Sequence, residues 1–77
     1  MRQPSDYPVL LRALAADDGG GYLAVVPDLP GCLSDGDTPE QAFANAQDAI
    51  AEWMATATDM GRPIPDPSPQ QLLKKVG

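Results

Sequence analysis

Apolar and polar residues alternate along the first third of the chain, which is the pattern of β-strands. The run YPVLLRALA predicts a strand over residues 7–15, and the run YLAVV predicts a second strand over residues 22–26. Residues 17–21 end in three glycines, which reach positive φ without a side-chain clash, so they predict the turn of a hairpin. A short third strand is expected at residues 31–34, ended by Asp35-Gly-Asp37. Three consecutive antiparallel strands in a meander are the simplest arrangement.

The pattern then changes to that of a helix. Thr38 is a good N-cap, Pro39 suits the first helical position, and Gln41 completes a capping-box pattern. Apolar residues follow at helical spacing and predict a buried stripe: Phe43, Ala46, Ile50, Trp53, Met54 and Ala57. Gly61 and Pro63 end the helix. We therefore predict an α+β fold over residues 1–62, a β-β-β-α core in which an antiparallel meander packs on one helix, with a Pro-rich tail or linker over residues 63–77.

The charge is strongly one-sided. The 77 residues carry a formal net charge of −6, and no lysine or arginine lies between Arg12 and Arg62, where the acidic residues gather. Because like charges repel, this stretch predicts a basic partner surface that balances them. The same acidity argues against direct binding of nucleic acid, which depends on lysine and arginine contacts with phosphate, and against an anionic membrane surface.

The residues needed for catalysis are largely missing. The chain has no histidine and a single cysteine, Cys32, so histidine-dependent hydrolysis and an intrachain disulfide are excluded. The Asp17-Asp18 and Asp35-x-Asp37 pairs beside glycines are typical of turns and match no calcium loop. No apolar stretch reaches membrane-spanning length and no signal-peptide core is present, which favours the cytoplasm. We therefore predict a binding protein with no catalytic residue, metal or cofactor.

Two groups of residues are candidates for contact with the partner. The charged group is Asp28, Asp35, Asp37 and Glu40. The apolar group is Leu29 with Pro30, because a leucine between two prolines, if exposed, would lose little entropy on docking. The same turn is equally compatible with a purely structural role.

Several sequence motifs, in this order and spacing, resemble the HicB antitoxin family. They are GYLAVVPDLPGC at residues 21–32, SDGDT at residues 34–38, an Ala-rich helix, and GRPIPDPS at residues 61–68. The resemblance covers roughly residues 7–69. It implies a cut-down RNase H fold and an antitoxin that neutralises HicA, a small basic RNA-cleaving toxin, by covering its RNA-binding surface and catalytic histidine.

The resemblance also raises an alternative. Family members usually add a fourth strand, and many add a DNA-binding domain, where this sequence stops at Gly77. The chain is then either a fragment of a longer antitoxin or a domain that completes its sheet in another way. An open first strand could pair with a second copy, giving a homodimer or higher oligomer. The alternative function is the oligomerisation and sensor domain of a transcriptional regulator whose DNA-binding domain is absent, and the reading frame beyond Gly77 distinguishes the two.

Overall fold

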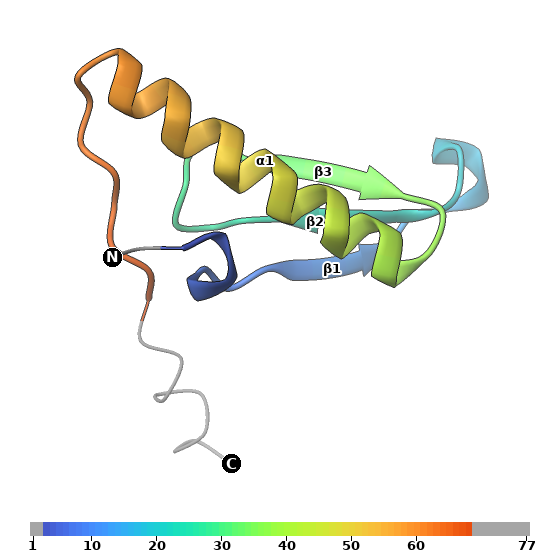
Figure 1. The fold of residues 1–77 in the computed structure, drawn as a ribbon. Helices are drawn as coiled ribbons and strands as arrows, with labels where there is room; N and C mark the ends of the chain where they lie inside the picture. The colour runs from blue at the N-terminus through green and yellow to red at the C-terminus, as the bar shows by residue number, and fades with distance from the viewer. Residues whose placement is uncertain (1–2, 69–77) are drawn as a thin grey trace, which may run out of the picture.

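The computed structural model describes residues 3–68 and contains one antiparallel sheet followed by one long helix (Figure 1). The sheet has three strands in the order β1-β2-β3, with bounds Leu10–Ala13, Tyr22–Val25 and Leu33–Gly36. The helix α1 spans Pro39–Asp59 and lies across one face of the sheet. Two short 3-10 helices, Pro4–Asp6 and Ala16–Asp18, precede β1 and β2. The predicted α+β meander is confirmed, whereas residues 69–77 of the predicted tail lie outside the described residues.

Strand pairing divides the sheet into two faces. Leu11 pairs with Ala24, which pairs with Ser34, and Ala24 is fully buried, so this row faces α1. Side chains alternate along a strand, so the neighbouring rows point the opposite way. Those rows run from β1 through β2 to β3, as Leu10–Val25–Leu33 and Arg12–Leu23–Asp35. We call the side that carries them the open face.

The first and third strands differ from their predicted bounds. The first is limited to Leu10–Ala13, and Tyr7 instead enters the core, where its hydroxyl donates a hydrogen bond to the carbonyl of Pro65. The third is shifted towards the helix, so that Asp35 and Gly36 belong to the strand rather than to a turn. Both residues pair with β2, and Asn45 of α1 donates its side-chain amide to the Asp35 carbonyl at 2.8 Å.

The helix begins as the sequence predicts. The Thr38 hydroxyl accepts a hydrogen bond from the Gln41 backbone N–H at 3.1 Å. The Gln41 side chain accepts from the Asp37 N–H at 2.7 Å, one residue before the partner of a standard capping box. The last helical residue is Asp59, and Gly61 follows with a φ of +70°, as expected for a glycine-ended helix.

The predicted apolar stripe is wrong at one position. Phe43 is 45% exposed, and Ala42, one residue earlier, is fully buried instead. The reason is the close approach of α1 to β3. A Cβ atom on Gly36 would lie 2.5 Å from the backbone nitrogen of Ala42. Only small residues fit where the first turns of α1 rest on the sheet, so the phenylalanine points to the rim.

Candidate partner-binding surface

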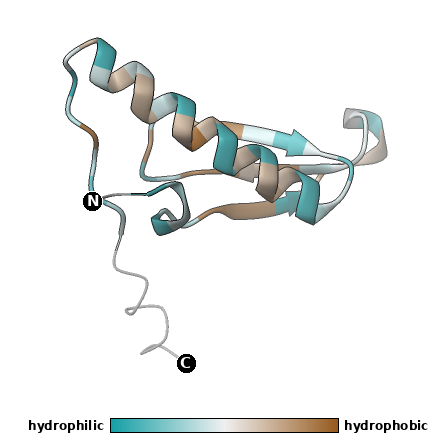
Figure 2. Cartoon of the chain, in the orientation of Figure 1, coloured by the Kyte–Doolittle hydropathy of each residue, from teal (hydrophilic) through white to brown (hydrophobic). Residues whose placement is uncertain are grey.

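The six residues predicted to contact a partner do not form one surface. Asp35, Asp37 and Glu40 are exposed and lie near one another, at the end of β3 and the start of α1. Hydrophilic residues are visible there in Figure 2. The other three, residues 28–30, lie in the β2–β3 turn at the opposite end of β3 (Figure 1).

Leu29 corrects the prediction of an exposed apolar anchor. Its side chain is 1% exposed and belongs to the hydrophobic core. The turn is closed by hydrogen bonds from the Leu29 N–H to the Val26 carbonyl and from the Cys32 N–H to the Leu29 carbonyl. In a domain of this size a buried leucine is a large part of the core, and the closed turn directs this side chain inward rather than outward.

Asp28 and Pro30 have roles within the domain. The Asp28 carboxylate accepts hydrogen bonds from the backbone N–H and the hydroxyl of Ser68, both at 2.7 Å. The Pro30 carbonyl accepts a hydrogen bond from the indole N–H of Trp53 at 3.0 Å. These bonds connect the β2–β3 turn to the segment after the helix and to the helix itself. The Pro30 ring remains exposed.

Four exposed carboxylates lie along α1 and just before its first residue, and we call them the acidic border: Asp37, Glu40, Asp48 and Glu52. The hydrogen bond from Asn45 to the Asp35 carbonyl places this flank of the helix beside β3. Asp48 and Glu52 follow Asn45 by three and seven residues, and therefore lie along the same flank. No lysine or arginine occurs between Arg12 and Arg62, so β2, β3 and α1 supply no basic side chain to neutralise the border.

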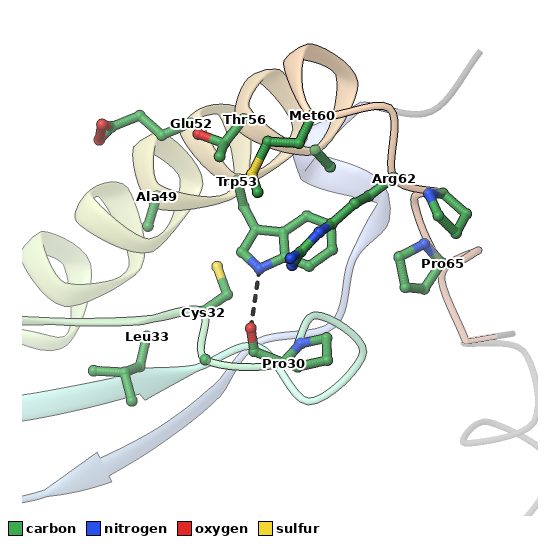
Figure 3. Close-up of a pocket in the computed structure, with 13 residues that line it drawn as sticks. Pro30, Cys32, Leu33, Ala49, Glu52, Trp53, Thr56, Met60, Arg62 and Pro65 are labelled. Carbon is green, nitrogen blue, oxygen red and sulfur yellow. Dashed lines mark hydrogen bonds between the residues drawn. The ribbon is translucent and has the colours of Figure 1, made fainter.

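An apolar groove adjoins the acidic border (Figure 3). Its volume is about 580 Å³. It lies between the β2–β3 turn, the C-terminal half of α1 and the returning segment after the helix. It is lined by Pro30, Gly31, Cys32, Leu33, Ala49, Glu52, Trp53, Thr56, Ala57, Met60, Arg62, Pro63 and Pro65. Glu52 belongs to both the groove and the acidic border.

Sequence reasoning missed this groove, although it correctly placed Trp53 against the core. The indole is half-buried, and its N–H is held by the Pro30 carbonyl, so one side of the ring lines the groove. The groove forms because the chain reverses at Gly61 and brings Pro63 and Pro65 back beside the turn. Gly61 and Pro63 predict that the helix ends and the chain turns there, but not where the next segment goes. That depends on the hydrogen bonds of Tyr7 with Pro65 and of Asp28 with Ser68.

The groove contains one thiol, that of Cys32. Cys32 is the nucleophilic side chain on its wall, and burial raises the pKa of its thiol, which keeps it protonated and unreactive. Across residues 3–68 no group of three or more histidine, cysteine, aspartate or glutamate side chains is placed to hold a metal ion. Over the same residues, no helix has both the length and the apolar character needed to span a bilayer.

Comparisons with known proteins place the chain in a family. Residues 7–76 match the family model described as a HicB-like antitoxin of bacterial toxin–antitoxin systems. An uncharacterised 14.9 kDa protein of Haemophilus phage HP1 is 33% identical over 63 residues, covering 82% of this chain and 44% of the phage protein. Antitoxin HicB 2 of Photorhabdus laumondii is 41% identical over 62 residues, covering 80% of this chain and 42% of that protein.

Shorter relatives also match. A UPF0150 protein of Synechocystis is 38% identical over 64 residues, covering 83% of this chain and 77% of the relative. The chain thus spans less than half of the phage protein and of Antitoxin HicB 2, and most of the UPF0150 protein.

Proposed function

This chain belongs to the HicB-like antitoxin family of bacterial toxin–antitoxin systems, and we propose that it binds and neutralises a small basic toxin of the HicA type. The observation that carries the proposal is an acidic border to which β2, β3 and α1 add no basic side chain, joined at Glu52 to an apolar groove that Arg62 also lines. The two surfaces together fit a protein partner that presents lysine or arginine beside an apolar side chain.

The two surfaces have different roles in binding. Opposite charges speed the encounter and disfavour wrong partners, whereas apolar contacts that exclude water supply most of the lasting affinity. The sequence predicts that Leu29 provides the apolar contact by projecting from the domain. Since Leu29 is buried, the domain instead offers a cavity, and the partner supplies the side chain that enters it.

Inhibition in this proposal is by coverage. The family assignment indicates a non-enzymatic role, and the chain has no histidine to act as a general base. A bound acidic domain occupies the RNA-binding surface of the toxin and its catalytic histidine, and repels RNA by its own charge. Inhibition should therefore reach completion at a fixed molar ratio, not increase with incubation time.

The first test is calorimetric titration of the chain with the basic product of the adjacent gene, at low and high salt. We expect tight binding that salt weakens, because exposed charges are screened. Glu52→Lys should weaken binding by about tenfold at low salt. Asp17→Lys makes the same change of charge in the β1–β2 connection and should have little effect. Equal losses in both variants would show that net charge, not the acidic border, governs binding. Absence of binding by the folded wild-type chain would overturn the proposed function.

The groove has its own matched pair of variants. Thr56 is exposed and lines the groove, whereas Thr58 is exposed on the same helix and lies outside it. Thr56→Trp should fill the groove and weaken toxin binding by tenfold or more, largely independently of salt. Thr58→Trp should bind like the wild type. If the two variants bind alike, the groove has no part in toxin recognition.

A further inference from the structure

The open face of the sheet is apolar along one complete row. Leu10 and Leu33 are 61% and 55% exposed, and both flank Val25 on β2. Figure 1 shows α1 across one side of the sheet. Strand pairing places this row on the other side, where Leu10 and Leu33 remain exposed among the described residues. Antiparallel sheets often leave one face in water, but that face is then mainly polar. Large aliphatic side chains gathered on such a face mark an interaction surface.

The neighbouring row on the same face carries two opposite charges. Arg12 on β1 and Asp35 on β3 lie on either side of Leu23, and both charged residues are exposed. The open face therefore has a positive edge and a negative edge at the same level along the strands, with aliphatic side chains between and beside them.

We propose that two copies of this chain associate through their open faces, about a twofold axis that runs along β2. Rotation about this axis places β1 of each copy over β3 of the other. Because Arg12 and Asp35 share one row, each Arg12 then lies over Asp35 of the second copy, and the pair forms twice. In the other row Leu10 lies over Leu33, and Val25 meets Val25. Sheets that pack face to face keep their strands within about 30° of one another, which suits this stacking.

The charges also exclude the other face-to-face arrangement. A twofold axis running across the strands would place β1 over β1 and β3 over β3. If this axis passes through the row of Arg12 and Asp35, each charge lies over the same charge of the second copy. If it passes between the two rows, Arg12 lies over Leu10 and Asp35 lies over Leu33. A twofold contact must be complementary to itself, and along this face only the axis parallel to β2 satisfies both the charges and the leucines.

The size of the face sets the strength of the dimer. Three strands of four residues make a contact smaller than the roughly 800 Å² per partner of a standard stable interface. The association is therefore weak and depends on protein concentration. This inference goes beyond the proposed function, because the open face lies on the opposite side of the sheet from α1, which carries most of the acidic border; Leu33 belongs to both the open face and the groove.

The test is sedimentation equilibrium of the full 77-residue chain over a wide range of concentrations, without toxin. We expect a monomer–dimer equilibrium. R12D and D35R should each weaken the dimer by about tenfold, since either change replaces two attractive pairs by two repulsive ones. The double variant R12D/D35R exchanges the charges and should restore the wild-type dissociation constant to within about threefold. Circular dichroism should show all three variants folded, because both positions are exposed.

Control substitutions separate the open face from other exposed apolar sites. Leu33→Lys should abolish the dimer, whereas Phe43→Ser on the rim of α1 should leave it unchanged. A wild-type chain that stays monomeric at all concentrations would overturn the proposal. A dimer that survives Leu33→Lys, or a double variant no better than its single parents, would also overturn it. Loss of toxin binding by Glu52→Lys with an unchanged dimer would leave this inference standing by itself.

Discussion

Gly36 is the position where the packing of helix on sheet is most sharply defined. A methyl group added there would lie 2.5 Å from the nitrogen of Ala42, 2.8 Å from the carbonyl carbon of Gln41 and 2.9 Å from the Cα of Ala42. All three are backbone atoms, so no change of rotamer relieves the contact. The φ of Gly36 is not positive, so Gly36→Ala introduces a steric wedge without backbone strain.

The size of the effect follows from the gap that must open. Ordinary van der Waals contact begins at 3.4 Å, so the first turns of α1 must retreat by about 1 Å. That movement loosens Ala42 and Ala46, which are both fully buried. Overpacking of this kind costs about 1–3 kcal/mol, and the reduced entropy of the unfolded chain returns about 0.4–1 kcal/mol. We expect a net loss of about 1 kcal/mol, a sizeable part of the roughly 4–12 kcal/mol available to a domain of this length.

Urea unfolding followed by the fluorescence of Trp53 would measure this loss, and the melting temperature should fall by about 6 °C. Ser34→Ala, on the same strand and the same face, is the control and should change stability by less than about 0.5 kcal/mol. The double variant Gly36→Ala/Ala42→Gly should not recover, because the clash is with backbone atoms. A wild-type midpoint for Gly36→Ala, or recovery in the double variant, would refute the packing argument.

Three further predictions concern single side chains. Tyr7→Phe removes the hydrogen bond to the Pro65 carbonyl and should cost about 1 kcal/mol in urea unfolding, whereas Tyr22→Phe should be neutral; equal losses would contradict a specific role for the Tyr7 hydroxyl. Thr38→Ala should cost about 1 kcal/mol through loss of the helix cap, and Thr38→Ser should keep most of it. The Cys32 thiol has a raised pKa because it is desolvated. Its contribution to stability is therefore complete below the pKa of about 8.5 in the unfolded chain and is lost as the pH rises above it. Cys32→Ala should flatten this part of the dependence of the unfolding free energy on pH. An unchanged slope would show that the thiol is not its source.

Local signals predicted the helix closely. Thr38 and Gly61 act through their own backbone and nearest neighbours, so their meaning does not depend on the rest of the fold, and α1 begins and ends where they indicate. The meander was likewise predictable, because short turns favour adjacent strands. Its strand bounds were less so, since Tyr7 leaves the strand pattern to bond with Pro65, which is 58 residues away.

Phe43 and Leu29 show where local reasoning ends. Helical periodicity predicts the buried face of a helix to within about one residue. Whether Ala42 or Phe43 is buried depends on Gly36, whose lack of a side chain lets the helix backbone approach β3. For Leu29, the rigid turn was predicted but its orientation was not, because burial depends on the core that surrounds the turn. The carboxylates of the acidic border are visible in the sequence, but only the packing of α1 beside β3 brings them together with the groove.

The two proposed surfaces lie largely on opposite sides of the sheet, and this arrangement has a consequence for assembly. Most of the acidic border belongs to the α1 side and the row of Leu10, Val25 and Leu33 to the open face, and Leu33 is shared because it also lines the groove. Toxin binding and self-association then need not compete, and a concentrated complex should contain two antitoxin chains and two toxins. R12D should halve the mass of that complex without changing the affinity for toxin, and Glu52→Lys should lower the affinity without changing self-association. If instead either variant altered both the affinity for toxin and self-association, the two surfaces would not act independently.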